Sequence, residues 1–217
     1  MAAGRVLVKV CGLTVLDEAL ACARAGADWI GLNFHPGSPR HVDESVARAI
    51  VSALPPRCTP VGLFVDRPPA EVAEMAARVG LRAVQLHGHE PPEDLATLRH
   101  LTLVRAFRLG DRAAVDRMMA YLERTVRLGR TPDAVLVDGY VAGQPGGTGQ
   151  TIDLGLLDHL PNLPHLILAG GLTPENVAQR VARARPWMVD VASGVELTPG
   201  RKDPARVAAF IMAVRGR

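Results

Sequence analysis

The sequence predicts an α/β fold, a single-domain (β/α)8 barrel of the TIM-barrel type that spans residues 1–217. Short runs rich in Val, Ile and Leu alternate with longer Ala-, Arg- and Glu-rich segments of helical period, which is typical of strand-helix units around a parallel sheet. Eight units in 217 residues leave about 27 residues for each, close to the roughly 30 residues of one unit. A doubly wound open sheet is the alternative, but CGLT after the first strand lacks the required G-x-G-x-x-G turn.

Each predicted strand is a short apolar run. In chain order the strands are VLVKVCG (6–12), DWIGLNF (28–34), TPVGLFV (59–65), AVQLHG (83–88), LVRAFRL (103–109), DAVLVDG (133–139), HLILAGG (165–171) and MVDVASGV (188–195). A helix is expected after every strand, and the clearest helices cover residues 15–25, 69–79, 113–125, 174–184 and 204–214. Asp66 ahead of Pro69 and Thr173 ahead of Pro174 are predicted to mark helix starts.

Composition limits the classes of partner. Only 4 Phe, 2 Trp and 2 Tyr are present, and 25 basic residues are balanced by 22 acidic ones, so a nucleic-acid surface is not expected. No apolar run of 18 residues exists to cross a membrane, and the first residues lack the long apolar segment of a signal peptide, which favours a cytoplasmic location. Cys11, Cys22 and Cys58 fit no paired motif and are read as thiols.

Two inward-facing residues end the first and sixth strands. Alternation along the first strand directs Val8 and Val10 toward the helices, and Lys9 and Cys11 toward the interior. We expect the Lys9 ammonium to lower the pKa of the Cys11 thiol. The same alternation directs Asp138 inward at the end of the sixth strand, so Cys11 and Asp138 are a candidate base and acid, although a packing cysteine and a capping aspartate remain alternatives.

Three loops rich in small residues follow the last three strands: GQPGGTGQT (143–151), AGG (169–171) and SGV (193–195). Glycines let the backbone approach an anion, and barrels bind phosphate after strands seven and eight. The loop 35–42 after the second strand carries Arg40, whose guanidinium is suited to a carboxylate.

Gln85 and His87 share one face of the fourth strand and are expected to line the cavity. No metal site is expected, because the HGH segment at 87–89 has no clustered carboxylates beside it.

Six ordered segments give the chain a family resemblance from Lys9 to about Asp203. KVCGLT, GLNFHPGSPRHV, VQLHG, VLVDG with GGTGQT, LAGGLTPENV, and VDVASGVE with PGRKD resemble the signature segments of phosphoribosylanthranilate isomerase. The resemblance implies a (β/α)8 barrel that performs an Amadori rearrangement in tryptophan biosynthesis, converting N-(5-phosphoribosyl)anthranilate to 1-(2-carboxyphenylamino)-1-deoxyribulose 5-phosphate. It also implies that no cofactor or metal takes part.

The resemblance also implies roles for individual residues. Cys11 in the KxCG segment corresponds to the general base and Asp138 in the VDG segment to the general acid. Arg40 corresponds to the group that holds the anthranilate carboxylate, and Asp190 to a contact with a substrate hydroxyl or amine. The family's phosphate loops correspond to Gly147, Gly149, Gly171, Ser193 and Gly194. Gln150 stands where the family often has lysine, so a lysine contact to phosphate is not expected there.

Two other functions stay open at this stage. One is another phosphosugar isomerase, such as that of histidine biosynthesis; that enzyme uses paired aspartates, so the cysteine in VKVCG argues against it. The other is a non-catalytic protein that binds a phosphorylated metabolite, which would be expected to have lost the acid or the base. In each case the expected partner is a small phosphorylated molecule, and the chain is expected to be a monomer or a homodimer.

Overall fold

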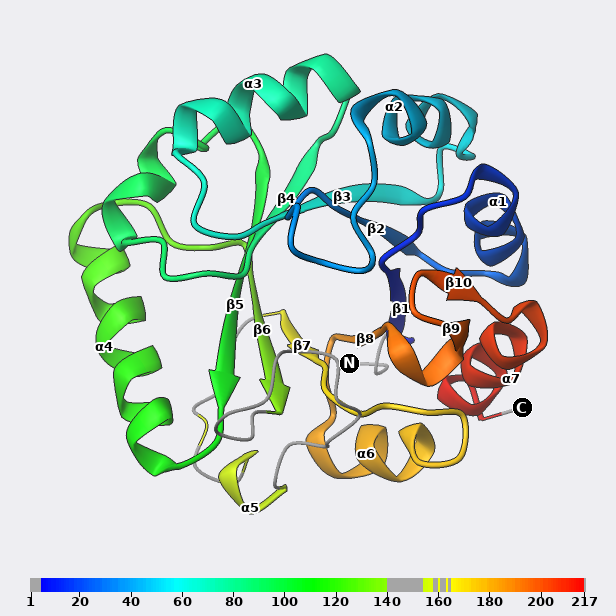
Figure 1. Cartoon of the computed structure of the whole chain (residues 1–217). Helices are drawn as coiled ribbons and strands as arrows, with labels where there is room; N and C mark the ends of the chain where they lie inside the picture. The colour runs from blue at the N-terminus through cyan, green and yellow to red at the C-terminus, as the bar shows by residue number, and fades with distance from the viewer. Residues whose placement is uncertain (1–4, 140–153, 158–159, 161–162, 164, 217) are drawn as a thin grey trace.

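Eight parallel strands close into a barrel in sequence order (Figure 1). The structure, a computed structural model, describes residues 5–139, 154–157, 160, 163 and 165–216. The strands are β1 (Leu7–Cys11), β2 (Trp29–Asn33), β3 (Thr59–Phe64), β4 (Ala83–Leu86), β5 (Thr102–Leu109), β6 (Ala134–Gly139), β7 (Leu166–Leu168) and β8 (Met188–Val191). The predicted barrel and all eight predicted strands are confirmed.

Helices surround the barrel on its outside (Figure 1). They are α1 (Leu16–Ala25), α2 (Glu44–Ala53), α3 (Pro69–Val79), α4 (Arg112–Arg127), α5 (Leu154–Leu157), α6 (Val177–Ala184) and α7 (Pro204–Val214). The chain also forms two 3-10 helices, η1 (Pro92–Ala96) and η2 (Ser193–Val195), and a two-stranded antiparallel sheet of β9 (Glu196–Thr198) and β10 (Arg201–Lys202). None of the described helices is long and apolar enough to cross a membrane.

Local sequence explains where several helices begin and end. Asp111 caps α4 by accepting a hydrogen bond from the Ala114 backbone N–H, which is otherwise without an intrahelical partner. Asp203 caps α7 in the same way, ahead of a proline at the first helical position. Gly26 ends α1 in the left-handed conformation, with φ of +105°, which glycine adopts at little steric cost.

Alternate residues of each strand pack in two separate apolar layers. Val8 and Val10 of β1 belong to the layer between strands and helices, whereas Leu136 of β6 belongs to the layer inside the barrel. This confirms the predicted inward direction of the residues that alternate with them. It also aligns the last inward residue of each strand at the carboxyl end of the barrel.

Three expectations about local structure are wrong. The short η1, rather than an α-helix, follows β4, with Pro91 at its N-cap and Pro92 at its first position. Asp66 does not cap α3: Pro68 takes the N-cap position, and the Asp66 carboxylate instead accepts a hydrogen bond from the His89 backbone N–H. Helix α6 begins at Val177 instead of residue 174, because the Asn176 side chain bonds to the preceding loop.

The hairpin formed by β9 and β10 was not predicted from the sequence. It follows β8 and η2 and lies beside α7 and β1 at the edge of the barrel opening (Figure 1). The Thr14 hydroxyl, in the loop after β1, donates to the Gly200 carbonyl in the turn of the hairpin at 2.8 Å. The hairpin is therefore tied to the loop that follows Cys11.

Candidate active site

A cavity of about 340 Å³ opens at the carboxyl ends of the strands. Nine of the residues predicted for the site line it: Cys11, Arg40, Gln85, His87, Asp138, Gly171, Asp190, Ser193 and Gly194. They come from strands or loops on every side of the barrel, so the closed sheet brings together residues that are far apart in the sequence. Gly147 and Gly149 lie outside the described residues.

Cys11 is buried at the carboxyl end of β1. Gly31 is its partner on β2, and a Cβ atom built on Gly31 would lie 2.6 Å from Cys11 Sγ, so the absence of a side chain there leaves room for the thiol. Burial raises the pKa of the Cys11 thiol and outweighs the positive charge of Lys9, which lowers it. Lys9 lowers this pKa as expected, but the net shift is upward because burial has the larger effect.

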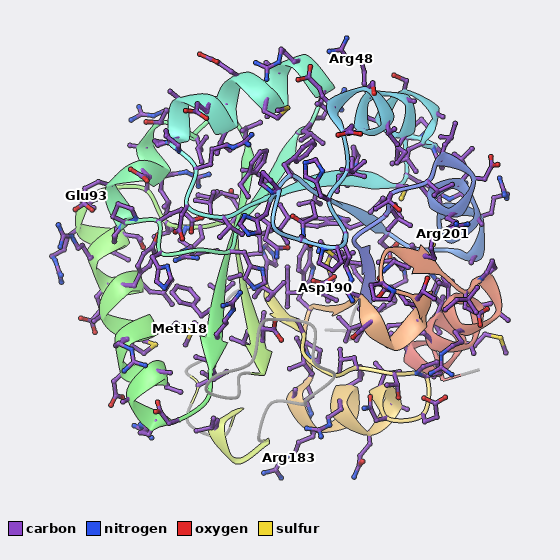
Figure 2. All side chains as sticks on the ribbon, viewed as in Figure 1. Arg48, Glu93, Met118, Arg183, Asp190 and Arg201 are labelled. Atoms are coloured by element: carbon purple, nitrogen blue, oxygen red, sulfur yellow. The ribbon has the colours of Figure 1, made fainter. Side chains whose placement is uncertain are left out.

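Lys9 and Asp190 form an ion pair inside the barrel. Lys9 Nζ lies 3.0 Å from each carboxylate oxygen of Asp190, and the lysine side chain is fully buried. In Figure 2, Asp190 lies near the middle of the molecule, whereas Arg48, Glu93 and Arg183 lie at its outer edge. Register explains the pair, because β1 and β8 close the barrel with these two residues opposite each other.

Asp138 lies near the carboxyl end of β6 and lines the same cavity as Cys11. Burial raises the pKa of its carboxyl to about 6, and the negative charge of Asp190 acts in the same direction. This carboxyl is protonated at a higher pH than an ordinary aspartate, which suits a proton donor. A Cβ atom on Gly170 would lie 2.6 Å from Asp138 Oδ1, so Gly170 allows the loop after β7 to pass close to the carboxyl.

Gln85 and His87 are hydrogen-bonded to each other on the inner face of β4. Gln85 Nε2 lies 2.8 Å from His87 Nδ1, and because the amide nitrogen is the donor, the proton of the neutral ring is on Nε2. Burial, together with the positive charges of Arg108 and Lys9, lowers the pKa of His87 to about 3. His87 Nε2 lies 3.8 Å from Asp138 Oδ2, too far for a hydrogen bond, so a neutral imidazole faces the carboxyl.

Arg40 enters the cavity from the loop after β2, and its guanidinium is held by Glu196. The Nε and Nη2 groups of Arg40 donate to the two carboxylate oxygens of Glu196 at 2.9 and 2.7 Å. The aliphatic part of Arg40 passes over Gly12, where a Cβ atom would lie 2.6 Å from Arg40 Cδ. Glu196 was not identified from the sequence.

The loops after β7 and β8 supply small residues on one side of the cavity. Gly171 has a φ of +57°, and Ser193 and Gly194 lie in η2. A Cβ atom on Gly194 would collide with the Leu172 carbonyl oxygen, so only glycine allows these two loops to approach so closely. These loops are the described part of the predicted phosphate site.

Sequence reasoning gave no individual role to four residues of functional interest: Gly31, Gly170, which it named only as part of the AGG loop, Arg108 and Glu196. The two glycines act through what their missing side chains allow, which depends on contacts across strands. Arg108 is the next inward residue after Ala106 on β5, so strand alternation could have identified it. No group of three or more His, Cys, Asp or Glu suited to a metal ion occurs in the part of the chain that the structure describes.

The chain matches a model of the N-(5'-phosphoribosyl)anthranilate isomerase family over residues 8–213. The chain belongs to the phosphoribosylanthranilate isomerase family. The resemblance found in the sequence is thereby confirmed. The chain accordingly catalyses the Amadori rearrangement of N-(5-phosphoribosyl)anthranilate in L-tryptophan biosynthesis, as an aldose-ketose isomerase.

Relatives of the phosphoribosylanthranilate isomerase family match nearly the whole chain. This chain is 48% identical over 208 residues to the enzyme of Pseudomonas syringae pv. syringae. The alignment covers 96% of this chain and 97% of the relative. The crystal structure of the Thermotoga maritima enzyme aligns with a TM-score of 0.88 and 36% identity, covering 98% of this chain and all of that one. Another solved family member, 34% identical with a TM-score of 0.82, covers the same shares and is in complex with reduced 1-(o-carboxyphenylamino)-1-deoxyribulose 5-phosphate.

Proposed function

We propose that Cys11 and Asp138 carry out the isomerisation as general base and general acid. The observation that carries this proposal is that a thiol and a carboxyl of raised pKa line one cavity, together with the cationic Arg40. The reaction needs one group that donates a proton and one that accepts a proton. Among the side chains that line the cavity or lie beside it, His87 stays neutral and Lys9 is paired with Asp190, which leaves the Asp138 carboxyl and the Cys11 thiol for these roles.

The reaction begins with opening of the ribose ring. The protonated Asp138 donates its proton to the ring oxygen, the bond from that oxygen to C1 breaks, and a Schiff base forms between C1 and the anthranilate nitrogen. Burial supports this role because it keeps the carboxyl protonated at a pH where an exposed aspartate has ionised. Gly170 supports it as well, since the loop after β7 leaves Oδ1 uncovered by a side chain.

The second step moves a proton away from C2. The Cys11 thiolate removes that proton, giving an enolamine; protonation at C1, with loss of the proton from the C2 hydroxyl, then yields the ketone of the product. Lys9 supports the thiolate because its charge lowers the pKa of Cys11 against the effect of burial. We assign Asp190 the role of keeping Lys9 in position, in addition to the substrate contact expected from the sequence.

The remaining residues bind the two anionic ends of the substrate. Arg40 takes the anthranilate carboxylate, and Gly171, Ser193 and Gly194, with Gly147 and Gly149, take the phosphate through backbone N–H groups. Gln85 fixes the ring orientation of His87, which contacts the substrate as a neutral donor.

The barrel of residues 1–217 acts as a single domain without a cofactor in this proposal. We propose further that the chain acts as a monomer or a homodimer in the cytoplasm.

Substrate turnover tests the proposed substrate against the other phosphosugar reactions. Purified protein is incubated with N-(5-phosphoribosyl)anthranilate, whose fluorescence is lost on isomerisation, and separately with the aminoaldose of histidine biosynthesis. We expect rapid loss of the first and no reaction of the second. Binding of the phosphorylated compound without turnover would indicate a non-catalytic binding protein instead.

A further inference from the structure

Two buried charged side chains, Glu196 and Lys202, lie beside Arg40. Glu196 accepts hydrogen bonds from Arg40 on one side and from Lys202 Nζ on the other, the latter at 2.6 Å to Oε1. The side chains of Glu196 and Lys202 are 5% and 1% exposed, so water contributes little to their solvation. The cluster of Arg40, Glu196 and Lys202 therefore contains two positive charges and one negative charge in a buried setting.

Glu196 is itself held firmly in place. The Gly200 backbone N–H donates to Glu196 Oε1 at 3.2 Å, and Lys202 Nζ also donates to the Ala192 carbonyl at 3.2 Å. Burial raises the pKa of Glu196, but the hydrogen bonds and charges of Arg40 and Lys202 outweigh it and lower the pKa overall. The carboxylate is therefore ionised and fixed by the hairpin of β9 and β10.

Glu196 occupies one edge of the Arg40 guanidinium. It takes Nε and Nη2, while Nη1 makes no hydrogen bond to any residue that the structure describes. A guanidinium has five N–H donors in one plane, so fixing the Nε edge also fixes the direction of the remaining donors. Arg40 lines the cavity, and its free edge is available to a ligand there.

We propose that Glu196 is a positioning residue that aims Arg40 at the substrate carboxylate, and that Lys202 keeps the cluster positively charged. The proposal rests on the proposed role of Arg40 in binding that carboxylate. Lys202 offsets the charge of Glu196, so one net positive charge remains for the substrate. Without Lys202, the pair of Glu196 and Arg40 would be neutral and would attract a carboxylate weakly.

This proposal makes the hairpin a determinant of specificity. The group to be recognised is an aromatic carboxylate next to the reacting amine, and the cluster contacts no other part of the substrate in the proposed reaction. A change at Glu196 is therefore expected to affect substrates that carry the carboxylate and to spare those that lack it. A residue that only stabilises the fold would affect both kinds of substrate equally.

The test compares N-(5-phosphoribosyl)anthranilate with N-(5-phosphoribosyl)aniline, which lacks the carboxylate. For Glu196→Gln and Lys202→Met we expect KM for the first substrate to rise by about tenfold or more, the scale of one charged hydrogen bond. In Glu196→Gln, kcat for this substrate is expected to change less than about twofold, and both kinetic constants for the aniline substrate are expected to stay at the wild-type level. Lys202→Met is expected in addition to lower kcat equally for both substrates, because the Lys202 charge also lowers the pKa of Cys11, so in this variant the rise in KM for the anthranilate substrate alone is the readout. Glu18→Gln is the matched control, because Glu18 bonds to Arg201 and to the Lys202 backbone N–H without touching Arg40.

Arg40→Leu separates the two levels of the argument. If it removes the preference for the anthranilate substrate while Glu196→Gln and Lys202→Met do not, the positioning role is overturned and the role of Arg40 stands. If Arg40→Leu leaves the preference intact, the carboxylate role of Arg40 and the positioning role both fail. An equal rise in KM for both substrates in either cluster variant would also overturn the proposal, and circular dichroism of each variant shows whether the fold is retained.

Discussion

The Lys9 ammonium lies 3.0 Å from both carboxylate oxygens of Asp190 in the interior of the barrel. Replacing one partner leaves a buried charge without its counter-charge, whereas replacing both leaves none. We expect Asp190→Asn to lower the free energy of unfolding by about 3–5 kcal/mol, and the double variant Lys9→Met with Asp190→Leu to recover most of that loss. Urea unfolding measures both. Equal losses in the single and double variants would show that the pairing does not determine the stability.

Gly170 is predicted to be essential for the position of the acid. An added methyl group would lie 2.6 Å from Asp138 Oδ1, on a backbone with φ of +86° that disfavours other residues. We expect Gly170→Ala to reduce kcat/KM by at least tenfold, a loss of about 1.4 kcal/mol of transition-state stabilisation. Gly129→Ala is the control, because Gly129 has a similar φ of +73° with nothing within 4 Å of the added atom. Similar activity of the two variants would remove the steric argument.

The pH dependence of kcat/KM follows from the directions of two pKa shifts. Asp138, with a pKa of about 6, must be protonated, and Cys11, whose pKa is raised by burial, must be ionised. Activity follows the product of the protonated fraction of Asp138 and the ionised fraction of Cys11. This product rises with pH up to about 6, because the thiolate fraction increases. It stays level between the two pKa values, where the two fractions change in opposite directions, and it falls above the pKa of Cys11, where the thiol is fully ionised and Asp138 continues to lose its proton. We therefore expect a bell-shaped profile whose acidic limb belongs to Asp138 and whose alkaline limb belongs to Cys11.

Arg108→Gln identifies the acidic limb. Arg108 lowers the pKa of Asp138 through its positive charge, so removing that charge should raise this pKa and move the limb to higher pH. The phosphate of the substrate also ionises near pH 6, but its titration is the same with both proteins. An unchanged limb in Arg108→Gln would assign it to the substrate or to another residue.

The barrel was predictable because strand identity depends on local features. Runs such as VLVKVC and AVLVDG are rich in branched apolar residues, and their alternation correctly directed Cys11 and Asp138 inward. The type of helix after β4 was not predictable in the same way. Its polar segment, which begins with two prolines, fits either a short 3-10 helix such as η1 or the start of a longer helix.

The parts of the site that escaped prediction depend on contacts between distant segments. Arg40 and Glu196 are 156 residues apart, and no local pattern marks one as the partner of the other. The net direction of the Cys11 pKa shift required the degree of burial, which the sequence does not contain, since the neighbouring Lys9 alone indicates the opposite sign. Gly31 and Gly170 matter because residues of neighbouring strands lie close to them: Cys11 beside Gly31, and Asp138 beside Gly170.

The central claim, that Cys11 and Asp138 are the base and the acid, is tested most directly by kcat/KM of Cys11→Ala and Asp138→Asn with N-(5-phosphoribosyl)anthranilate. We expect each variant to lose a factor of about 100 or more, the scale of general acid-base catalysis, while Cys22→Ala, which alters a buried thiol in α1, keeps its activity. Full activity of either Cys11→Ala or Asp138→Asn would contradict the assignment.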